Sequence, residues 1–397
     1  MTLNRTYILW RVIRIVAVAA WFTGPGIPVY AVDSLRDQIV AAQTSGHYAE
    51  AAQLYLQLIA SGSDGPAIRS NCGVMLHLAG NNREALEQFR IALRQQPDLP
   101  APNLFAGIAE FELGEFNAAL PYLNKAQQLD PGRPAPLLAL AKVYVALRDY
   151  RRANELYEKA VTLDGRLAEA WYGLGVTSRS LAEQLLNQTA RQGEIKSAAK
   201  NEKIQQLLNS AVQALTRAVE LDPNSGRAHL LMAESLADAG KPLEAVSEFN
   251  AAIKLDPRLD AAYLGLATNY WKQHQFDQAL PLLEYLLRKS PNDPEINAMM
   301  ADLLDHNGDV ANAEKHARIA LAANPGLIQT HVVLARIYLA RQQPKLAITE
   351  LRKVISADPD GNYHYLLYRA CRLAGDEPGA KEALAEFRQI RYAARKP

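Results

Sequence analysis

Histidine and cysteine side chains are the groups in this sequence that could hold a metal ion or act as nucleophiles. The eight histidines form no HExxH motif and no cluster with cysteine. His306 and His316 share one segment, but we expect them on different helices and therefore predict no metal site. Cys72 and Cys371 lie so far apart in the chain that we expect two separate thiols and no disulfide, with Cys72 at a core position.

A pair of glycines, Gly173 and Gly175, could begin a loop that binds phosphate groups. Such a loop follows a strand and continues into a GK[ST] motif, and this sequence has neither feature here. Both glycines fall inside a predicted helix, so we interpret them as packing residues. No serine lies in a recognisable nucleophile elbow, and we expect neither catalysis nor a cofactor.

The elements that would position any functional side chain follow from a regular spacing of prolines. The prolines in question are Pro97, Pro131, Pro223, Pro257, Pro291, Pro325 and Pro359. Each lies 34 residues after the one before, except for one gap of 92 residues, which equals two periods and 24 extra residues. With proline at position 32, ten units begin at residues 32, 66, 100, 134, 168, 226, 260, 294, 328 and 362. A period of this length indicates stacked repeats, each burying its apolar face against its neighbours.

Small residues mark where two helices of a unit meet. Position 20 is alanine in nine of the ten units, which lets two helices approach closely. Position 15 is often glycine, as at Gly46, Gly80, Gly114, Gly240 and Gly308, and would end the first helix in a left-handed conformation. Proline at position 32 would end the second helix. Each unit is therefore predicted to be helix, turn, helix, turn.

With these positions in view, the chain resembles the tetratricopeptide repeat (TPR) family. Residues 134–167 carry the family pattern at Leu137, Leu140, Ala141, Tyr144, Ala153, Tyr157 and Ala160. The resemblance implies an all-α fold, a right-handed superhelical solenoid of antiparallel helix pairs with about ten TPR units over residues 32–395. The first and last units fit least well, because Gln38 replaces leucine and the register slips by one after Gly375.

The resemblance also implies a concave groove lined by the first helix of each unit. The groove would bind a protein or peptide through residues at positions 2, 5, 9, 12 and 13, and it would be apolar in units 100–225 and charged further on. The expected groove residues are Leu104, Ile108, Phe111, Leu138, Lys142, Val145, Tyr172, Glu234, Trp271, Asp302 and Arg336. An alternative for each of them is packing against the neighbouring repeat. The lysine and asparagine clamp by which some family members hold a C-terminal carboxylate is absent.

The unit 168–225 contains 24 extra residues, which we assign to a helical hairpin insertion at 179–205. Leucines continue at helical spacing on both sides, and residues 187–203 are polar. We expect both helices to be longer and to turn near Gly193. The hairpin is either a handle for a partner or a neutral elaboration.

The N-terminal residues 1–31 have the order of a secretory signal peptide. Arg5, Arg11 and Arg14 precede an apolar stretch, which ends in glycine and proline before Ala31. We expect cleavage after Ala31 and export to the periplasm or the extracellular space. The alternative is an uncleaved anchor at residues 10–32, and only then would the protein bind a membrane.

Charge and composition narrow the classes of function. The sequence is 49% hydrophobic and 21% charged, and its net charge is +1. This balance does not indicate nucleic-acid binding. We expect a non-enzymatic scaffold or adaptor in envelope or secretion-related assembly. The alternative is a recognition arm that delivers substrates to an enzyme on another chain, such as a glycosyltransferase or a protease.

Overall fold

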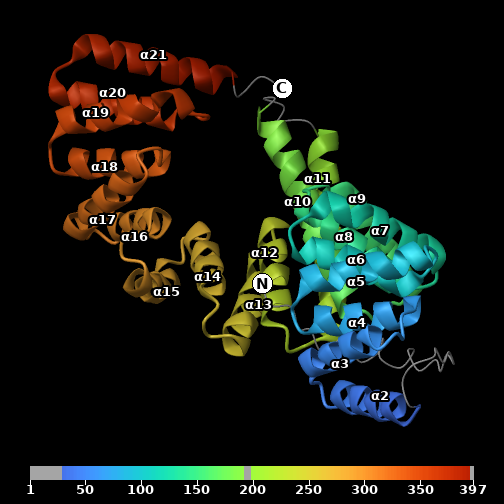
Figure 1. Cartoon of the computed structure of the whole chain (residues 1–397). Coiled ribbons are helices and arrows are strands. Elements are labelled where there is room, and N and C mark those ends of the chain that lie inside the picture. Colours follow the sequence, from blue (N-terminus) through green and yellow to red (C-terminus); the bar gives the residue numbers. More distant parts are fainter. Residues whose placement is uncertain (1–28, 192–197, 394–397) are drawn as a thin grey trace. The chain divides into compact units, whose positions relative to one another are not determined.

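The computed structural model describes residues 29–191 and 198–393, which form twenty α-helices and no strand. The helices alternate as antiparallel pairs in chain order (Figure 1). The first helices of the pairs are α2 (Val29–Thr44), α4 (Pro66–Leu78), α6 (Pro100–Glu112), α8 (Pro134–Ala146), α10 (Ala168–Arg191), α12 (Gly226–Asp238), α14 (Asp260–Lys272), α16 (Pro294–His306), α18 (Ile328–Ala340) and α20 (Asn362–Ala374).

The second helices pack against the first ones. They are α3 (Tyr48–Ala60), α5 (Asn82–Gln95), α7 (Phe116–Leu129), α9 (Tyr150–Leu163), α11 (Ala198–Leu221), α13 (Pro242–Leu255), α15 (Phe276–Lys289), α17 (Val310–Ala323), α19 (Pro344–Val354) and α21 (Glu377–Ala393), and a 3-10 turn η2 (Ile355–Ala357) follows α19. The prediction of an all-α solenoid built from ten helix pairs is confirmed.

Alanine at position 20 forms the centre of each pair, as its spacing predicts. All nine of these alanines are 0% exposed: Ala51, Ala85, Ala119, Ala153, Ala211, Ala245, Ala279, Ala313 and Ala347. Glycines on first helices allow equally close contact, either with the partner helix or with the second helix of the preceding repeat. A Cβ atom added to Gly173 would lie 2.3 Å from the Tyr157 ring, which confirms that Gly173 is a packing residue.

Backbone geometry explains where the helices end and begin. The turn at position 15 has a positive φ at each of the five predicted glycines, for example 74° at Gly46. Glycine adopts this conformation without steric cost. Six helices have proline as their first residue. The backbone N–H at this position has no partner within the helix, so its absence in proline costs no hydrogen bond.

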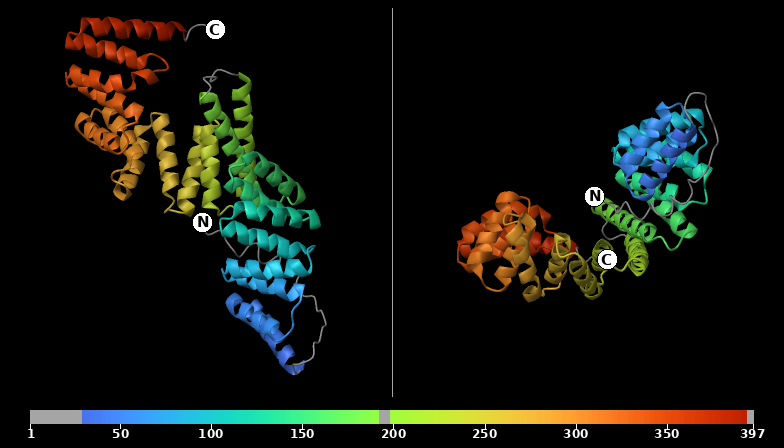
Figure 2. Two further views of the ribbon diagram at one scale, coloured as in Figure 1. Left: turned by 45° about the horizontal axis from the view of Figure 1, so that its top comes forward. Right: turned by 60° about the horizontal axis from the view of Figure 1, so that its bottom comes forward.

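The chain divides into two compact units, residues 1–181 and 182–397, and each is a separate stack of helix pairs. Within each unit, the first helices of neighbouring repeats contact one another, for example α4 with α6 and α16 with α18. Second helices of neighbouring repeats make no comparable contacts among the described residues. The side formed by the first helices is therefore the more tightly curved one, and we call it the inner face of that unit. The successive layers of α16 to α21 are visible at the orange and red end of Figure 2.

A polar side chain at position 4 ties several repeats to the one before. It lies within hydrogen-bonding distance of the carbonyl oxygen at position 32 of the preceding repeat, six residues upstream. The pairs are Asn103 with Pro97 (3.0 Å), Trp171 with Gly165 (2.9 Å), His229 with Pro223 (3.2 Å), Asn297 with Pro291 (2.9 Å) and His331 with Pro325 (3.0 Å). Gly165 takes part although it replaces the periodic proline, because the bond uses the backbone carbonyl.

The insertion appears as two helices of unusual length. α10 and α11 have 24 residues each, whereas the other repeats have first helices of 13 or 16 residues. At 1.5 Å per residue, about ten additional residues lengthen a helix by roughly 15 Å. The expected turn near Gly193 and most of the predicted leader lie outside the described residues, and α2 begins at Val29. None of the described helices has the length and apolar character needed to cross a membrane.

Candidate functional site

All eleven side chains predicted to line the groove belong to first helices, from α6 to α18. These side chains therefore follow one another along the inner faces of the two units in the same order as in the sequence. Their exposure differs, however, and this decides which of them can touch a partner. The first unit contributes seven of them, ending with Tyr172 on α10, and the second unit contributes four.

Two of the predicted groove residues are not free surface. Leu104 is 6% exposed and packs in the core with Leu123 and Val143. It supports the helix pair and is excluded as a contact residue. Asp302 is also 6% exposed, and both of its carboxylate oxygens accept hydrogen bonds within the protein. Sequence position alone could not separate these side chains from their exposed neighbours, because burial depends on how closely adjacent repeats stack.

The inner face of the first unit is largely apolar. Ile108 and Phe111 are partly buried against the core, and the Phe111 ring lies 5.6 Å from the ring of Phe116. Leu138, Val145 and Tyr172 are half-buried on the next two first helices, α8 and α10. Half-buried apolar side chains on successive repeats can still lose solvent-exposed area when a partner binds.

One cation on this face is already paired. Lys142 of α8 forms an ion pair with Glu169 of α10, and both side chains are about a quarter to a third exposed, at 23% and 32%. The pair links two repeats and neutralises the charge of the lysine. Glu169 was not predicted to belong to the site, although it occupies position 2 of its unit and could have been found from the register.

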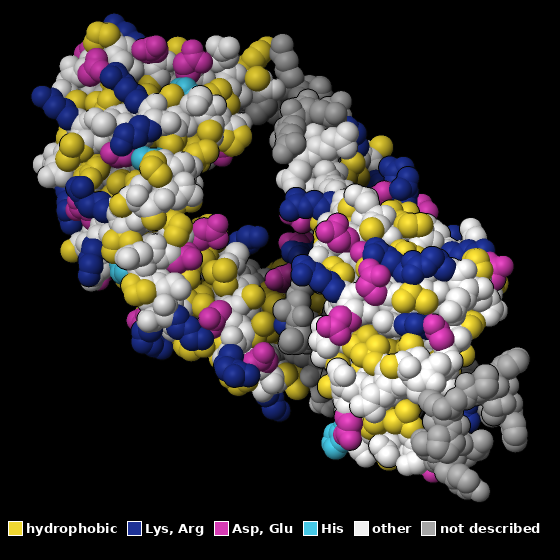
Figure 3. All heavy atoms as spheres, in the orientation of Figure 1, with side chains coloured by type: hydrophobic (Ala, Val, Ile, Leu, Met, Phe, Trp, Pro, Cys, Tyr) yellow, Lys and Arg dark blue, Asp and Glu magenta, His cyan; other side chains and the backbone are white. Residues whose placement is uncertain are grey.

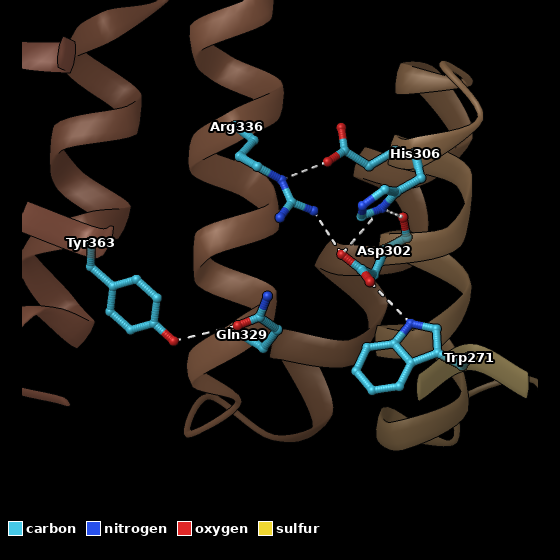
Figure 4. A network of polar contacts seen from close by, with 7 residues as sticks. Trp271, Asp302, His306, Gln329, Arg336 and Tyr363 are labelled. Atoms are coloured by element: carbon cyan, nitrogen blue, oxygen red, sulfur yellow. Dashed lines mark hydrogen bonds and ion pairs between the residues drawn. The ribbon is translucent and has the colours of Figure 1, made fainter. Parts of the chain in front are cut away.

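In the second unit, the predicted residues Trp271, Asp302 and Arg336 meet in one network across three repeats (Figure 4). The indole N–H of Trp271 donates to Asp302 Oδ2 at 3.0 Å. The guanidinium of Arg336 donates from Nη2 to Asp302 Oδ1 at 2.7 Å and from Nε to Asp305 Oδ2 at 2.8 Å. The three first helices α14, α16 and α18 are thereby joined by charge-assisted hydrogen bonds.

The guanidinium of this network is held in its charged state. Burial opposes the charge of Arg336, but hydrogen bonds and charges from Asp302 and Asp305 outweigh burial and raise the pKa of Arg336. His306 lies beside them, with Nδ1 2.9 Å from the backbone oxygen of Asp302. Two carboxylates surround one guanidinium, so this part of the inner face has a small excess of negative charge.

A second polar contact lies next to the network. The hydroxyl of Tyr363 on α20 is 3.4 Å from Gln329 Oε1 on α18, and Figure 4 shows Gln329 on the same helix as Arg336. Neither residue was predicted, although both occupy position 2 of their units. Glu234 of α12 is half-buried and belongs to the same unit.

The metal-binding and thiol groups of the described residues are considered next. No three His, Cys, Asp or Glu side chains within residues 29–191 and 198–393 are placed to hold a metal ion. Both cysteines are buried and free, and burial raises the pKa of the Cys72 thiol to about 11, which leaves it protonated and unreactive. Acidic and basic side chains are interspersed on the face in view in Figure 3, and this mixture does not resemble a basic nucleic-acid surface.

Curated proteins that resemble this chain include one named as a TPR repeat-containing protein and two of which the chain covers less than half. The TPR repeat-containing protein YpiA of Bacillus subtilis is 22% identical over 64% of this chain. The Protein CTR9 homolog of Arabidopsis thaliana is 23% identical over 80%, and human Protein O-mannosyl-transferase TMTC3 is 22% identical over 81%. The chain spans 63%, 28% and 39% of the lengths of these three relatives.

Two solved structures match parts of this chain. YrrB, described as a TPR protein with an unusual peptide-binding site, is 23% identical, with a TM-score of 0.41 over 52% of this chain and 94% of its own. Pseudomonas aeruginosa PilF is 19% identical, with a TM-score of 0.46 over 59% and 96%.

The tetratricopeptide repeat family itself matches in seven overlapping segments. They are residues 36–100, 79–134, 110–174, 205–260, 236–303, 270–326 and 306–370. These segments cover well over half of the chain and coincide with the helix pairs described above. The chain therefore belongs to the tetratricopeptide repeat family.

Proposed function

We propose that this protein is a non-enzymatic scaffold that binds a partner segment on the inner faces of its two units. The observation that carries the proposal is the placement of half-buried side chains on successive first helices, one repeat after another. Ile108, Phe111, Leu138 and Val145 offer apolar contact area in the first unit, and the Trp271 network offers fixed charges in the second.

The two inner faces would contribute differently to binding. An apolar surface gains free energy when a partner removes it from water, so the first unit would supply most of the affinity. Charges that are already paired and oriented contribute mainly to specificity, since a mismatched partner would have to desolvate them. A partner segment with apolar anchors would therefore bind the first unit, and a segment with a complementary polar sequence would bind the second unit.

Partner capture in the native cell tests this function. Proximity labelling identifies candidate partners, and purified Phe111→Glu and Leu138→Glu variants are then measured for binding to them. A carboxylate forced into an apolar contact should weaken binding by at least about tenfold. Leu163→Glu is the matched control, because Leu163 is 46% exposed on α9, away from the inner face of the same unit. If both inner-face variants remain folded and keep every partner, the apolar inner face is not the binding site.

We further propose that the partner belongs to an envelope or secretion-related assembly. The support is the order of residues 1–31, which is typical of a secretory signal peptide. Mass spectrometry of the mature N-terminus tests this part of the proposal. A protein that begins after Ala31 would be exported and soluble, whereas one that retains residues 10–32 would be anchored.

The alternative is a recognition arm that brings substrates to an enzyme on another chain. One relative, Protein O-mannosyl-transferase TMTC3, is itself an enzyme by name, and this chain matches a part amounting to 39% of its length. A stable complex of fixed composition would support the scaffold. Transient capture of many unrelated peptides, together with one glycosyltransferase or protease, would support the recognition arm.

A further inference from the structure

Two exposed histidines from adjacent repeats meet where the first helices α14 and α16 end. His274 lies in the turn between α14 and α15, and His306 is the last residue of α16. The centres of their rings are 6.3 Å apart, and the ring planes are inclined by 42°. The sequence could not suggest this pair, because the two histidines occupy different positions of different repeats.

Phe276 supports both imidazole rings from the protein side. Its ring centre lies 5.7 Å from that of His274 and 4.8 Å from that of His306, distances at which aromatic rings attract one another. The Phe276 side chain also packs against the core formed by Leu283 and Leu303. The two histidines therefore share a support that is anchored in the core, although both are exposed on their outer side.

The hydrogen bond of His306 leaves its second nitrogen available. His306 Nδ1 lies 2.9 Å from the backbone oxygen of Asp302, which can only accept, so Nδ1 carries the hydrogen of the neutral ring. The lone pair is then on Nε2. Histidines that bind metal ions typically donate from the other nitrogen in this way, because the bond fixes the orientation of the ring. Asp302 is itself held by Trp271 and Arg336 (Figure 4).

The surroundings of the pair favour a positively charged ligand. The network beside His306 contains two carboxylates and one guanidinium, and so has an excess of one negative charge. On the turn that carries His274, Lys272 and Asp277 are both exposed and opposite in sign. Among residues 29–191 and 198–393, none forms a side-chain hydrogen bond or an ion pair with His274.

The spacing of the rings suits a metal ion bound by both. Imidazole nitrogen is a preferred ligand of Zn²⁺ and Ni²⁺. Each nitrogen in a zinc site is about 2.0–2.1 Å from the metal, so two histidine nitrogens on one ion are about 3–4 Å apart. Ring centres 6.3 Å apart permit this spacing when the two nitrogens point toward one another. His274 is exposed and has room to turn in this way.

We propose that His274 and His306 form a binding site for a divalent transition-metal ion such as Zn²⁺, which bridges two repeats of the second unit. No group of three His, Cys, Asp or Glu side chains occurs here in the described part of the chain, so water would fill the remaining coordination positions. The ion would tie the turn after α14 to the end of α16. This site goes beyond the partner binding proposed above and does not depend on it.

Calorimetric titration of the full chain with Zn²⁺ alone tests the site. Wild type should bind the ion, and His274→Asn and His306→Gln should each weaken binding by about tenfold or more, because each removes one of two protein ligands. Asparagine suits position 274, since it tolerates the left-handed backbone there, where φ is 59°. No binding to wild type, or equal affinity in wild type and both variants, would overturn the proposal.

His47→Gln is the matched control. The side chain of His47 is 67% exposed, so this variant removes an accessible imidazole far from the proposed site in sequence. Its affinity for Zn²⁺ should equal that of wild type. An equal loss of affinity in His47→Gln would mean that exposed histidines in general bind the ion, and this result would also overturn the proposal.

A spectroscopic measurement on wild type locates the ion without any substitution. ¹⁵N chemical shifts of the imidazole rings respond when a ring nitrogen binds a metal ion. One equivalent of Zn²⁺ should shift the resonances of both His274 and His306. Shifts confined to other histidines would contradict the site directly.

Discussion

Asn297 and His316 form a hydrogen-bonded pair in which the His316 ring donates and burial favours its neutral form. The amide nitrogen of Asn297 donates to the carbonyls of Pro291 and Asp293, at 2.9 and 2.8 Å. Its oxygen is therefore the acceptor for His316 Nδ1, at 2.7 Å. Burial, and then the charge of Lys315, lower the pKa of His316 below its ordinary value.

The lowered pKa predicts a loss of stability in acid. As the pH falls below about 6.5, the ordinary value for histidine, the unfolded chain takes up a proton before folded His316 does. The unfolded state then binds more protons, so the free energy of unfolding decreases with falling pH. His316→Gln keeps a donor for Asn297 and should make this decrease between pH 7 and pH 5 smaller, measured by urea unfolding. An unchanged pH dependence would show that His316 titrates alike in both states.

Gly173 gives a prediction about close packing. Replacing Gly173 with alanine places a methyl group 2.3 Å from the Tyr157 ring, so either the ring or the backbone has to move. Overpacking of this kind costs about 1–3 kcal/mol. Urea unfolding of Gly173→Ala should show that loss. In the Tyr157→Leu background, which lacks the ring, the same glycine replacement should cost less stability. An equally large loss of stability in that background would mean that the methyl group clashes elsewhere.

The sequence predicted which residues share the inner face, but not which of them pair. Trp271, Asp302 and Arg336 were placed on one face because they occupy positions 12, 9 and 9 of their units, which the resemblance to the TPR family assigns to the groove. Their hydrogen bonds depend on the distance and angle between adjacent first helices, which no spacing encodes. For the same reason the sequence could not reveal that Leu104 is buried while Phe111 remains partly exposed.

At the scale of elements, the turn at position 15 requires a left-handed backbone in residues other than glycine as well. Arg148, His274 and Gln342 occupy this position with φ of 59°, 59° and 57°. A residue with a Cβ atom pays roughly 1 kcal/mol or more for this conformation. The glycines at equivalent positions were predictable from the sequence. The three exceptions show that the turn is imposed by packing of the helix pair.

Glycine should therefore stabilise the turns that lack it. Arg148→Gly and Gln342→Gly should each raise the free energy of unfolding by up to about 1 kcal/mol, because both side chains are exposed and only the strain is removed. Gln342→Ala is the matched control, since alanine retains the Cβ atom and should give no such gain. A gain of equal size with alanine would mean that the side chain, and not the backbone, is the source of strain.

The repeat explains why so much of the fold was predictable. Nine of the ten helix pairs bury an alanine at position 20 against the partner helix, and the pattern recurs in register. The bonds from position 4 to the preceding carbonyl were not predicted, because asparagine, tryptophan and histidine share no obvious property in sequence. These three residue types have in common only a hydrogen-bond donor that can reach the carbonyl oxygen at position 32 of the preceding repeat.

At the scale of the whole molecule, the account rests on each unit having one face for binding. The inner faces carry half-buried side chains from successive repeats, while exposed leucines such as Leu163 and Leu346 lie on second helices. A scaffold that used its second helices would bury those leucines instead. The two possibilities place the partner on different faces of each unit, one formed by first helices and the other by second helices.

Site-specific photo-crosslinking in the native cell tests this claim most directly. A photoreactive residue is placed on the inner faces at Val145 or Gln329, and on second helices at Leu163 or Leu346, each in the full chain. We predict crosslinks to the same protein partner from Val145 and Gln329, and none to that partner from Leu163 or Leu346. Crosslinks to a partner from the second helices alone would contradict the account.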